Sequence, residues 1–251
     1  MKNVCLSELR KLFRFKFVAL SLLITLGLEL LFTYLLYWKA KGFLVLDLEK
    51  SSGLSYSFRS IAPFIGIISL CIYASNTAQE YLYGTLKNLL IRMPNRTQLI
   101  LGKVLALSIF VSLLITLAAI WGATLSYIFS PLAKVSTGKW FLFSTSFITT
   151  WANVVLSSIA YGLIGSVIAL ILRSSVGAIS AGIIWILVIE TLFGFLGKAI
   201  ARWLPGANLA NFGDGGSKEL SYTHSLLVVL IYVGIGLIIM VTLFSKRDVA
   251  N

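Results

Sequence analysis

The sequence contains six long apolar stretches separated by short polar or basic segments. They cover residues 17–38, 61–78, 104–130, 141–172, 176–196 and 224–244. A helix rises about 1.5 Å per residue, so about 20 apolar residues cross the ~30 Å hydrocarbon core of a bilayer. Backbone amides and carbonyls that cross lipid must be hydrogen-bonded within the chain, which a helix achieves. The pattern therefore predicts an all-α, polytopic membrane protein with six transmembrane helices.

The composition argues against a soluble fold. Hydrophobic residues make up 58% of the 251 residues and charged residues only 12%, and the mean hydropathy is +0.94. A soluble protein would have to bury six helices that are apolar all round, which leaves little to face water. No segment between the stretches is long enough for a separate soluble module, so residues 1–251 are expected to form a single transmembrane domain. The first stretch follows a basic segment and is expected to be a retained helix, not a cleaved signal.

The net charge of +12 could suggest a nucleic-acid partner, but the basic residues gather at the ends of the apolar stretches. The positive-inside rule explains that distribution, so membrane lipids and no nucleic acid are the expected surroundings. If both termini are cytoplasmic, twelve Lys and Arg residues lie on the cytoplasmic side and nine on the other, and five of the twelve precede residue 17. We therefore expect both termini in the cytoplasm.

Two other segments have recognisable patterns. Residues 1–16 place apolar residues on one helical face and basic residues elsewhere, which predicts an interfacial helix lying against anionic headgroups, with a solvated basic tail as the alternative. Residues 197–223 form the most loop-like segment, and the part before Pro205 predicts a short re-entrant or interfacial helix that the proline ends. Small residues in the fourth and fifth stretches suit packing within the bundle and a homodimer seam equally well. These are Ser157, Ser158, Gly162, Gly165, Ser166, Ala178 and Gly182.

The segment from Asn76 to Lys103 is the longest polar run predicted to face the cytoplasm. Thr77 can cap a helix, with Glu80 three residues later to complete a capping box. Leucines and tyrosines then recur at helical spacing, and Pro94 breaks the pattern before a second polar cluster that runs from Arg96 to Lys103. We interpret residues 79–93 as a short amphipathic helix along the cytoplasmic face. An ordinary interfacial loop is the alternative.

This segment resembles a family. Glu80, Gly84-Thr85-Leu86, Leu89-Leu90, Pro94, Arg96 and Gly102-Lys103 are similar to the pattern E…GTL…LL…P..R…..GK of type-2 ABC exporter permeases. The six stretches, the basic amphipathic helix before the first, Trp203-Leu204-Pro205 before the last and the Phe244–Asp248 tail agree with that family over the whole chain. The segment from Glu80 to Lys103 is the specific part of the resemblance.

The resemblance implies that residues 79–93 are a coupling helix that docks into a groove on an ABC ATP-binding subunit, present in two copies. The residues that it assigns to this coupling are Glu80, Tyr81, Leu82, Tyr83, Gly84, Thr85, Leu86, Arg92, Pro94, Arg96 and Lys103. It also implies a dimer with a second permease copy, identical or a paralogue, with the substrate path near the second and fifth spans. The location implied is the bacterial cytoplasmic membrane.

The sequence holds no G-x-x-x-x-G-K-[ST] phosphate loop, because Gly102-Lys103 is followed by Val104. A permease of this kind therefore needs a separate ATPase, and ATP and Mg²⁺ are expected on that partner, with no cofactor on this chain. No cluster of His, Cys and Asp has metal-ligand spacing, and no nucleophile–base set can be assembled. We predict neither a metal site nor a catalytic site, and the chain is not expected to be an enzyme itself.

Two acidic residues fall inside the apolar stretches, Glu29 in the first and Glu190 in the fifth. An acidic side chain near the middle of a bilayer is costly, so each is expected to face a cavity or a partner. They could line the substrate path and contact cationic groups or bind protons. Alternatively, each could be protonated or hydrogen-bonded within the bundle.

Three functions remain open on the sequence alone. The first is the permease subunit of an ATP-driven exporter, whose short length resembles permeases that export amphipathic peptides, bacteriocins, toxins or hydrophobic drugs. The second is a proton- or ion-coupled secondary transporter that uses Glu29 and Glu190, although the two halves show no internal repeat. The third is an assembly or sensor subunit that transports nothing.

Overall fold

The computed structural model describes residues 2–41, 43–82, 95–217 and 220–246, and these residues form helices and turns without a strand. The long helices are α1 (Lys2–Leu12), α2 (Phe15–Lys39), α5 (Ala62–Leu82), α7 (Arg96–Phe129), α8 (Thr145–Leu172), α9 (Ser175–Ile184) and α13 (Tyr222–Lys246). The short ones are α3 (Phe43–Leu48), η1 (Gly53–Ser55), α4 (Tyr56–Ser60), η2 (Ser130–Ala133), the π-helical η3 (Trp185–Ile189), α10 (Glu190–Leu196), α11 (Lys198–Ala201) and α12 (Pro205–Gly213).

Within the described part of the chain, five helices are long and apolar enough to cross a membrane. They cover Lys16–Lys39, Arg96–Ala133, Thr145–Leu172, Ser175–Gly194 and Tyr222–Phe244. A sixth span is counted if Gly53–Ser60 and Ala62–Gln79, which meet at an angle of 43°, cross together. The chain is therefore an all-helical, multi-pass membrane protein with five to six candidate spans.

Polar caps set the first residues of two spans. The third span begins at Arg96 and not at residue 104, because the Asn95 side chain accepts a hydrogen bond from the Gln98 amide at 3.1 Å. The fourth begins at Thr145 and not at residue 141, where Ser144 caps the Phe147 amide at 3.3 Å. A hydropathy pattern misses both positions because polar residues are favoured at a helix start whatever follows them.

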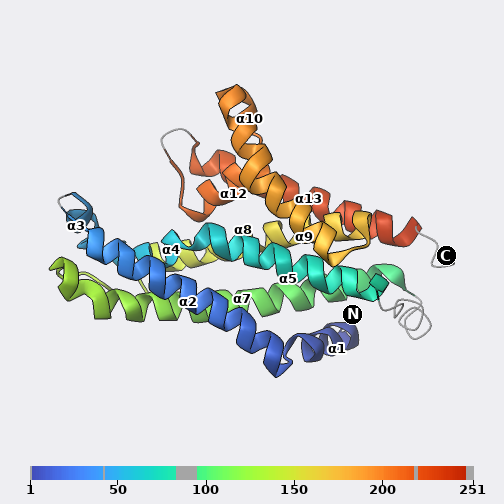
Figure 1. The fold of residues 1–251 in the computed structure, drawn as a ribbon, viewed down its shortest axis with the longest axis horizontal. Helices are drawn as coiled ribbons and strands as arrows, with labels where there is room; N and C mark the ends of the chain where they lie inside the picture. Colours follow the sequence, from blue (N-terminus) through green and yellow to red (C-terminus); the bar gives the residue numbers. More distant parts are fainter. Residues whose placement is uncertain (1, 42, 83–94, 218–219, 247–251) are drawn as a thin grey trace.

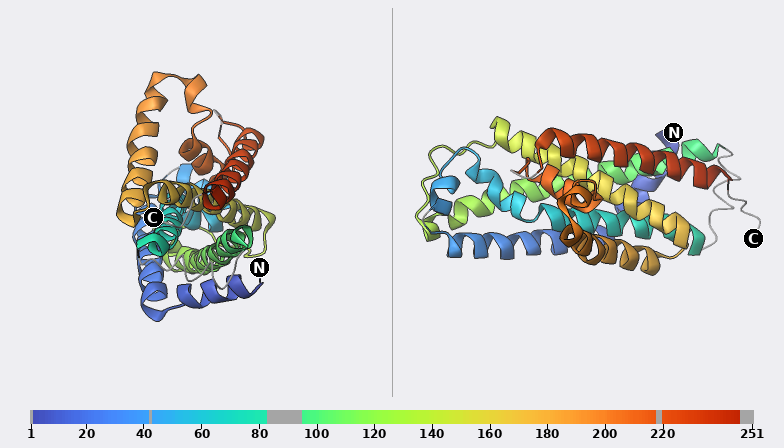
Figure 2. Two further views of the ribbon diagram at one scale, coloured as in Figure 1. Left: turned by 90° about the vertical axis from the view of Figure 1, so that its right-hand side faces the viewer. Right: turned by 90° about the horizontal axis from the view of Figure 1, so that it is seen from above.

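The helices run along one long axis, and the bundle has two distinct ends (Figure 1). The terminal end holds both chain termini, the last turn of α5, the first turn of α7 and the turn from α8 to α9. The loop end holds α3, η1 and η2. The helix α1 lies across the bundle at the terminal end and packs against α7 (Figure 2). Its buried side chains are Val4, Cys5, Glu8 and Leu12, whereas Leu6 and Phe13 of the predicted apolar face are exposed.

The closest packing in the bundle joins α5 to α8. A Cβ atom at Gly165 would lie 2.6 Å from the Leu70 carbonyl oxygen, and one at Gly162 would lie 2.5 Å from the Tyr73 ring. Gly182 of α9 meets the Leu70 side chain in the same way. Across this seam Ser69 donates to the Ser158 carbonyl at 2.6 Å. The small residues of the fourth and fifth stretches therefore serve packing within the bundle, where they let backbones approach closely.

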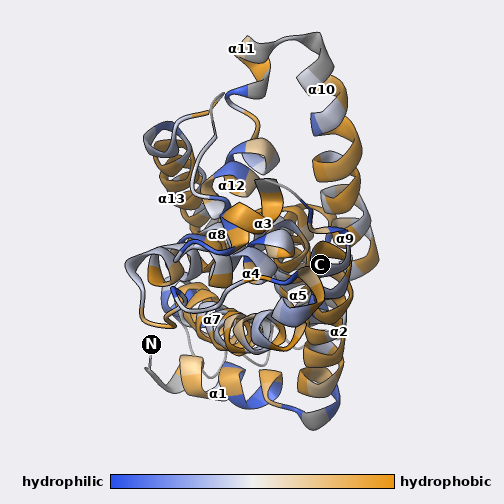
Figure 3. Cartoon of the chain, turned by 90° about the vertical axis from the view of Figure 1, so that its left-hand side faces the viewer, coloured by the Kyte–Doolittle hydropathy of each residue, from blue (hydrophilic) through white to orange (hydrophobic). Residues whose placement is uncertain are grey.

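The outer faces of the bundle are apolar. Few residues of the spans that contain α2, α9 and α13 are buried within the structure, and apolar side chains such as Leu23, Val176 and Ile238 are exposed. The ribbons of these helices are predominantly hydrophobic (Figure 3). An aqueous protein would rarely expose surfaces of this extent. In a bilayer these faces would contact lipid tails.

The fifth span leaves the bundle along its length. Its first part, α9, packs against α5 and α8, whereas α10 packs chiefly against its chain neighbours η3 and α11 and leans away (Figure 1). The helix α12 lies between α10 and α13 and packs against α8 (Figure 2). The short helix predicted before Pro205 corresponds to α11, which ends at Ala201. Pro205 has a further role that the sequence did not predict. It is the first residue of α12, where its missing amide hydrogen costs nothing and its fixed φ suits the helix.

Candidate functional site

The residues predicted for ATPase coupling fall at the terminal end of the bundle, where α5 and α7 meet. Glu80, Tyr81 and Leu82 form the last turn of α5, while Arg96 and Lys103 lie in the first two turns of α7. Tyr83, Gly84, Thr85, Leu86, Arg92 and Pro94, and with them most of the predicted coupling helix 79–93, lie outside the described residues. The connection thus starts and finishes at the same end of the molecule as the two termini (Figure 1).

The prediction that Thr77 caps a helix is wrong. The helix α5 continues without a break from Ala62 to Leu82, so Gln79 and Glu80 extend the second span. Thr77 is buried, and its hydroxyl lies 3.1 Å from that of Ser166 in α8 instead of capping a helix. The local sequence fits a capping box, but the apolar contact with α8 keeps this turn inside the span.

Glu29 belongs to a stripe of polar side chains on α2. We define the α2 stripe as Ser21, Thr25, Glu29, Thr33 and Tyr37, which recur every four residues and are all buried. Residues four apart lie near one another on a helix surface, so the stripe forms a single, slowly winding polar line. The apolar residues between them, such as Leu23 and Leu31, are exposed on the outer face.

The helices α7 and α4 cover the α2 stripe. Gly122 of α7 faces Glu29 directly, because a Cβ atom at Gly122 would lie 2.2 Å from Oε1 of Glu29. The same position lies 3.4 Å from the backbone nitrogen of Phe58 in α4. One turn further along, the hydroxyls of Ser57 in α4 and Ser126 in α7 lie 2.6 Å apart. The carboxyl group therefore occupies the space that the missing side chain of Gly122 leaves.

The Glu29 carboxyl group has an unusual environment for an acid. Its side chain is 0% exposed, and within the described residues neither carboxyl oxygen has a hydrogen-bond partner. Within the same residues the buried Thr33 hydroxyl also has no partner. An ionised carboxylate near the centre of a span costs at least ~2.5 kcal/mol. The arrangement is therefore compatible with a neutral carboxylic acid and incompatible with an isolated charge.

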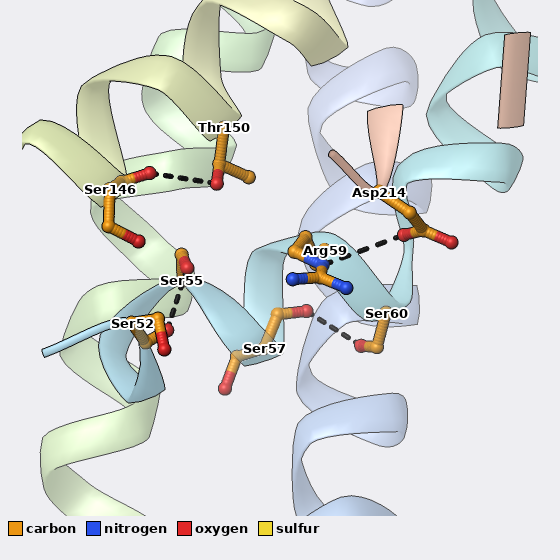
Figure 4. A network of polar contacts seen from close by, with 8 residues as sticks. All are labelled: Ser52, Ser55, Ser57, Arg59, Ser60, Ser146, Thr150 and Asp214. Carbon is orange, nitrogen blue, oxygen red and sulfur yellow. Dashed lines mark hydrogen bonds and ion pairs between the residues drawn. The ribbon is translucent and has the colours of Figure 1, made fainter. Parts of the chain in front are cut away.

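A second polar cluster closes the loop end of this region (Figure 4). Nε of Arg59 in α4 lies 3.6 Å from Oδ1 of Asp214, the residue that follows α12. Burial raises the pKa of the Asp214 carboxyl, and the Arg59 guanidinium partly opposes that rise. Hydroxyls on the neighbouring turns bond to backbone carbonyls, as Ser55 does to Ser52 at 2.7 Å and Ser60 to Ser57 at 2.7 Å. This cluster fixes α4 against the end of α12.

Glu190 has a different role from Glu29. Its carboxylate accepts hydrogen bonds from the backbone amides of Gly206 at 2.9 Å and Ala207 at 3.1 Å. These amides belong to the first turn of α12, which has no partner for them within its own helix. A carboxylate at a helix N-terminus is stabilised by those donors and by the helix dipole. Of the two alternatives for Glu190, the structure shows the hydrogen-bonded one.

Further polar side chains hold α12 in the bundle. Gly206 is the closest point, because a Cβ atom there would lie 2.6 Å from Oε2 of Glu190. Tyr161 of α8 donates to the Gly206 carbonyl at 3.2 Å. The Asn211 amide of α12 donates to the Ser225 hydroxyl of α13 at 2.7 Å. The helix is thus joined to α8, α10 and α13 by specific hydrogen bonds.

The structure does not bring Glu29 and Glu190 together, because their neighbours are different residues on different helices. The prediction of a path lined by both residues has no support in their contacts. The α2 stripe was missed on the sequence alone, although it has a readable signal. Within residues 17–38 every Ser, Thr and Glu lies on that four-residue spacing. Among the described residues no group of three His, Cys, Asp or Glu side chains could hold a metal ion.

The fold and this buried acid define a multi-pass helical membrane protein in which, among the described residues, the Glu29 carboxyl group lies in the interior without a hydrogen-bond partner. Residues 26–250 match the family described as "Protein of unknown function (DUF2705)", and the chain belongs to this family. It is also similar to the uncharacterized protein YhcI of Bacillus subtilis (strain 168), with 25% identity over 203 residues. The aligned part is 74% of this chain and 65% of that relative, so the chain spans just under two thirds of the relative's length.

Proposed function

We propose that this chain is the transmembrane permease subunit of an ATP-driven ABC exporter. The observation that carries the proposal is the residue pattern from Glu80 to Lys103. It lies in the connection between two helices that both reach the terminal end of the bundle. A connection at that end suits a contact with a soluble ATPase on the same side as the two termini. The burial of Lys103 also supports a fixed position for the first turns of α7.

The proposal includes specific partners. An ABC ATP-binding subunit, in two copies, would bind ATP and Mg²⁺ and contact the segment 79–93. A second permease copy, identical or a paralogue, would complete the transmembrane part. The wide apolar faces of α9 and α10 are available to such a copy or to lipid. The cytoplasmic membrane of a bacterium, with both termini in the cytoplasm, is the proposed location.

The proposed cargo is an amphipathic peptide, a bacteriocin or another toxin, or a hydrophobic drug. This assignment depends on the resemblance of a short chain to permeases that move such compounds. The described residues support it indirectly, because their exposed surface is predominantly apolar along the spans. A cargo that partitions into lipid could reach such a surface from the bilayer.

A proton- or ion-coupled secondary transporter is the second candidate, and one observation favours it. Glu29 is an acid buried without a partner in the described part of the chain, as expected of a proton site in a transporter. Glu190 contributes less to this candidate, because its carboxylate is already held by the first turn of α12.

The coupling assignment is tested by co-expressing the chain with an ABC ATP-binding subunit and reconstituting the complex in liposomes. We expect Glu80→Ala and Gly84→Pro to leave membrane insertion and ATP hydrolysis measurable while abolishing ATP-dependent transport of a labelled amphipathic peptide. Glu49→Ala is the matched control, because Glu49 lies at the loop end and accepts a bond only from the Ser136 amide among the described residues. We expect that control to transport normally.

Two results would overturn the proposal. The first is normal transport by both coupling variants. The second is transport by the isolated chain that needs a proton gradient and no ATP, and that stops in Glu29→Gln. That second result would establish the secondary transporter instead.

A further inference from the structure

The hydroxyl groups around Glu29 differ on its two sides along α2. Towards the terminal end, Thr25 donates to the Ser21 carbonyl at 2.8 Å and Ser21 to the Val18 carbonyl at 2.9 Å. These hydroxyls are committed to their own helix. Towards the loop end, the Thr33 hydroxyl is buried and has no hydrogen-bond partner among the described residues, and the buried Tyr37 hydroxyl lies beside those of Ser57 and Ser126. The hydroxyls of the α2 stripe that do not bond to their own helix therefore lie on the loop-end side of Glu29.

The loop-end side continues across the neighbouring helices. The hydroxyls of Ser57 in α4 and Ser126 in α7 form a pair at 2.6 Å, and both side chains are fully buried. Ser126 also donates to the Gly122 carbonyl, the residue that faces Glu29, at 2.8 Å. The Tyr37 hydroxyl lies beside this serine pair. Beyond Ser57 the chain leads into the hydroxyl and ion-pair cluster at the loop end (Figure 4).

No charged side chain faces Glu29 within the described residues. Gly122 of α7 lies opposite it, close to the backbone of Phe58 in α4. The nearest basic residue on α4 is Arg59, and its guanidinium is paired with Asp214 and lies over the Tyr56 ring. On α2 itself the only other titratable member of the stripe is Tyr37. Burial away from water and from positive charge favours the neutral, protonated form of a carboxyl group.

From this geometry we infer that Glu29 is a proton-binding site that exchanges its proton with the loop-end side of the membrane, on which Thr33 and Tyr37 of the α2 stripe lie. The step is balanced: a hydronium ion gives one proton to the carboxylate, leaving water and a carboxylic acid. Each hydroxyl can accept a proton on its oxygen and release its own. A metal cation fits less well, because the carboxyl oxygen itself fills the space over Gly122. This inference does not depend on the proposed exporter function.

Infrared spectroscopy of the purified full-length protein in liposomes tests the site. At neutral pH we expect a carboxylic acid C=O stretching band that is absent from Glu29→Gln, unchanged in Glu49→Gln and unaffected when sodium is replaced by choline. The glutamine side chain has nearly the shape of the protonated acid, so this variant should fold. If the wild-type minus Glu29→Gln difference instead contains the bands of an ionised carboxylate, or depends on sodium, the site is not a proton site.

The direction of exchange is tested separately by transferring the protein to heavy water and following the shift of the same band. Thr33→Val removes the hydroxyl next to Glu29 on the loop-end side, so the band should shift more slowly, by about tenfold or more. Thr25→Val is the matched control on the opposite side of Glu29, and it should leave the rate unchanged. Equal rates in the two variants, or slowing only in Thr25→Val, would overturn the assignment of the loop-end side.

Discussion

At the residue scale, two glycines in neighbouring helices have opposite roles. Gly122 of α7 lies against the Glu29 carboxyl, whereas nothing lies within 4 Å of a Cβ atom built on Gly27 of α2. The first glycine is required by a close approach and the second is not. The pair therefore offers a direct measurement of how tightly the buried acid is packed.

We expect Gly122→Ala to destabilise the protein by about 1–3 kcal/mol, the usual cost of overpacking a filled interior. Gly27→Ala should stabilise it by up to about 1 kcal/mol, because alanine is the better helix former. Thermal unfolding of both variants in the same detergent measures the difference. Equal stabilities would show that the carboxyl group moves away from Gly122 without cost.

A pH dependence is expected at Asp214. Burial raises the pKa of this carboxyl above its value in the unfolded chain, and Arg59 opposes the rise. An ionised carboxyl with a raised pKa destabilises the folded state, and this penalty disappears as the pH falls through the folded pKa. Both side chains are partly exposed, so the effect should stay within about 1 kcal/mol.

We therefore expect Asp214→Asn to be at least as stable as the wild type at neutral pH. As the pH is lowered towards 4, the wild type should gain stability relative to this variant, which carries no titratable group at the position. Unfolding curves of the two proteins across that pH range provide the measurement. A wild type that loses stability relative to Asp214→Asn on acidification would show that the Arg59 pair outweighs burial.

At the element scale, α12 depends on side chains from other helices for its position. The Gly206 amide in its first turn donates to Glu190, and the Gly206 carbonyl accepts from Tyr161. The Asn211 side chain donates to Ser225. Glu190→Gln replaces a charged acceptor with a neutral amide and leaves one good acceptor for two amides. We expect a loss of about 1–2 kcal/mol, comparable to losing a helix cap.

Hydrogen exchange resolves where that loss occurs. In Glu190→Gln the amides of Gly206 and Ala207 should exchange faster than in the wild type, while amides along the α5–α8 seam should be unchanged. Glu49→Gln is the control, since it should affect only the neighbourhood of Ser136. Unchanged exchange at Gly206 would show that the Glu190 carboxylate is not what holds the first turn.

The element boundaries show what the sequence alone could and could not predict. All six apolar stretches correspond to helices. This part was predictable because hydropathy can be read from each stretch alone, without knowledge of its contacts. The helix that begins at Pro205 was not predicted, because a proline can follow the end of one helix and also begin the next. The residue that bonds to the first turn of α12 is Glu190, sixteen residues before Gly206. The cap predicted at Thr77 was wrong because its contact with Ser166, far away in the sequence, cannot be read from the local residues.

The candidate site was predictable in part. Both intramembrane acids were identified from their cost in lipid, but their different environments come from long-range contacts. Gly122 is 93 positions from Glu29, and nothing in the sequence indicates that they meet. The four-residue spacing of the α2 stripe was readable, and it would have shown that Thr33 and Tyr37 belong with Glu29.

At the scale of the whole molecule, the two ends of the bundle give a prediction of topology. The first described residues of α1, the last of α13, the end of α5 and the start of α7 lie at the terminal end, and residues 134–143 lie at the other (Figure 1). Reporter fusions at residues 1 and 251 should both be active in the cytoplasm, and a reporter inserted at Gly138 should be active only outside it. Reporters at the two termini on opposite sides of the membrane would exclude an even number of spans.

The arrangement of the fifth span has a mechanical consequence. The helix α9 packs against α5 and α8, whereas α10 packs chiefly against its chain neighbours. The π-helical turn η3 lies between them. Such a turn carries one extra residue and is a weak point in a helix. The two hydrogen bonds that Glu190 accepts from backbone amides attach α10 to α12. A displacement of α12 would therefore release α10 and open that side of the bundle to the surrounding bilayer.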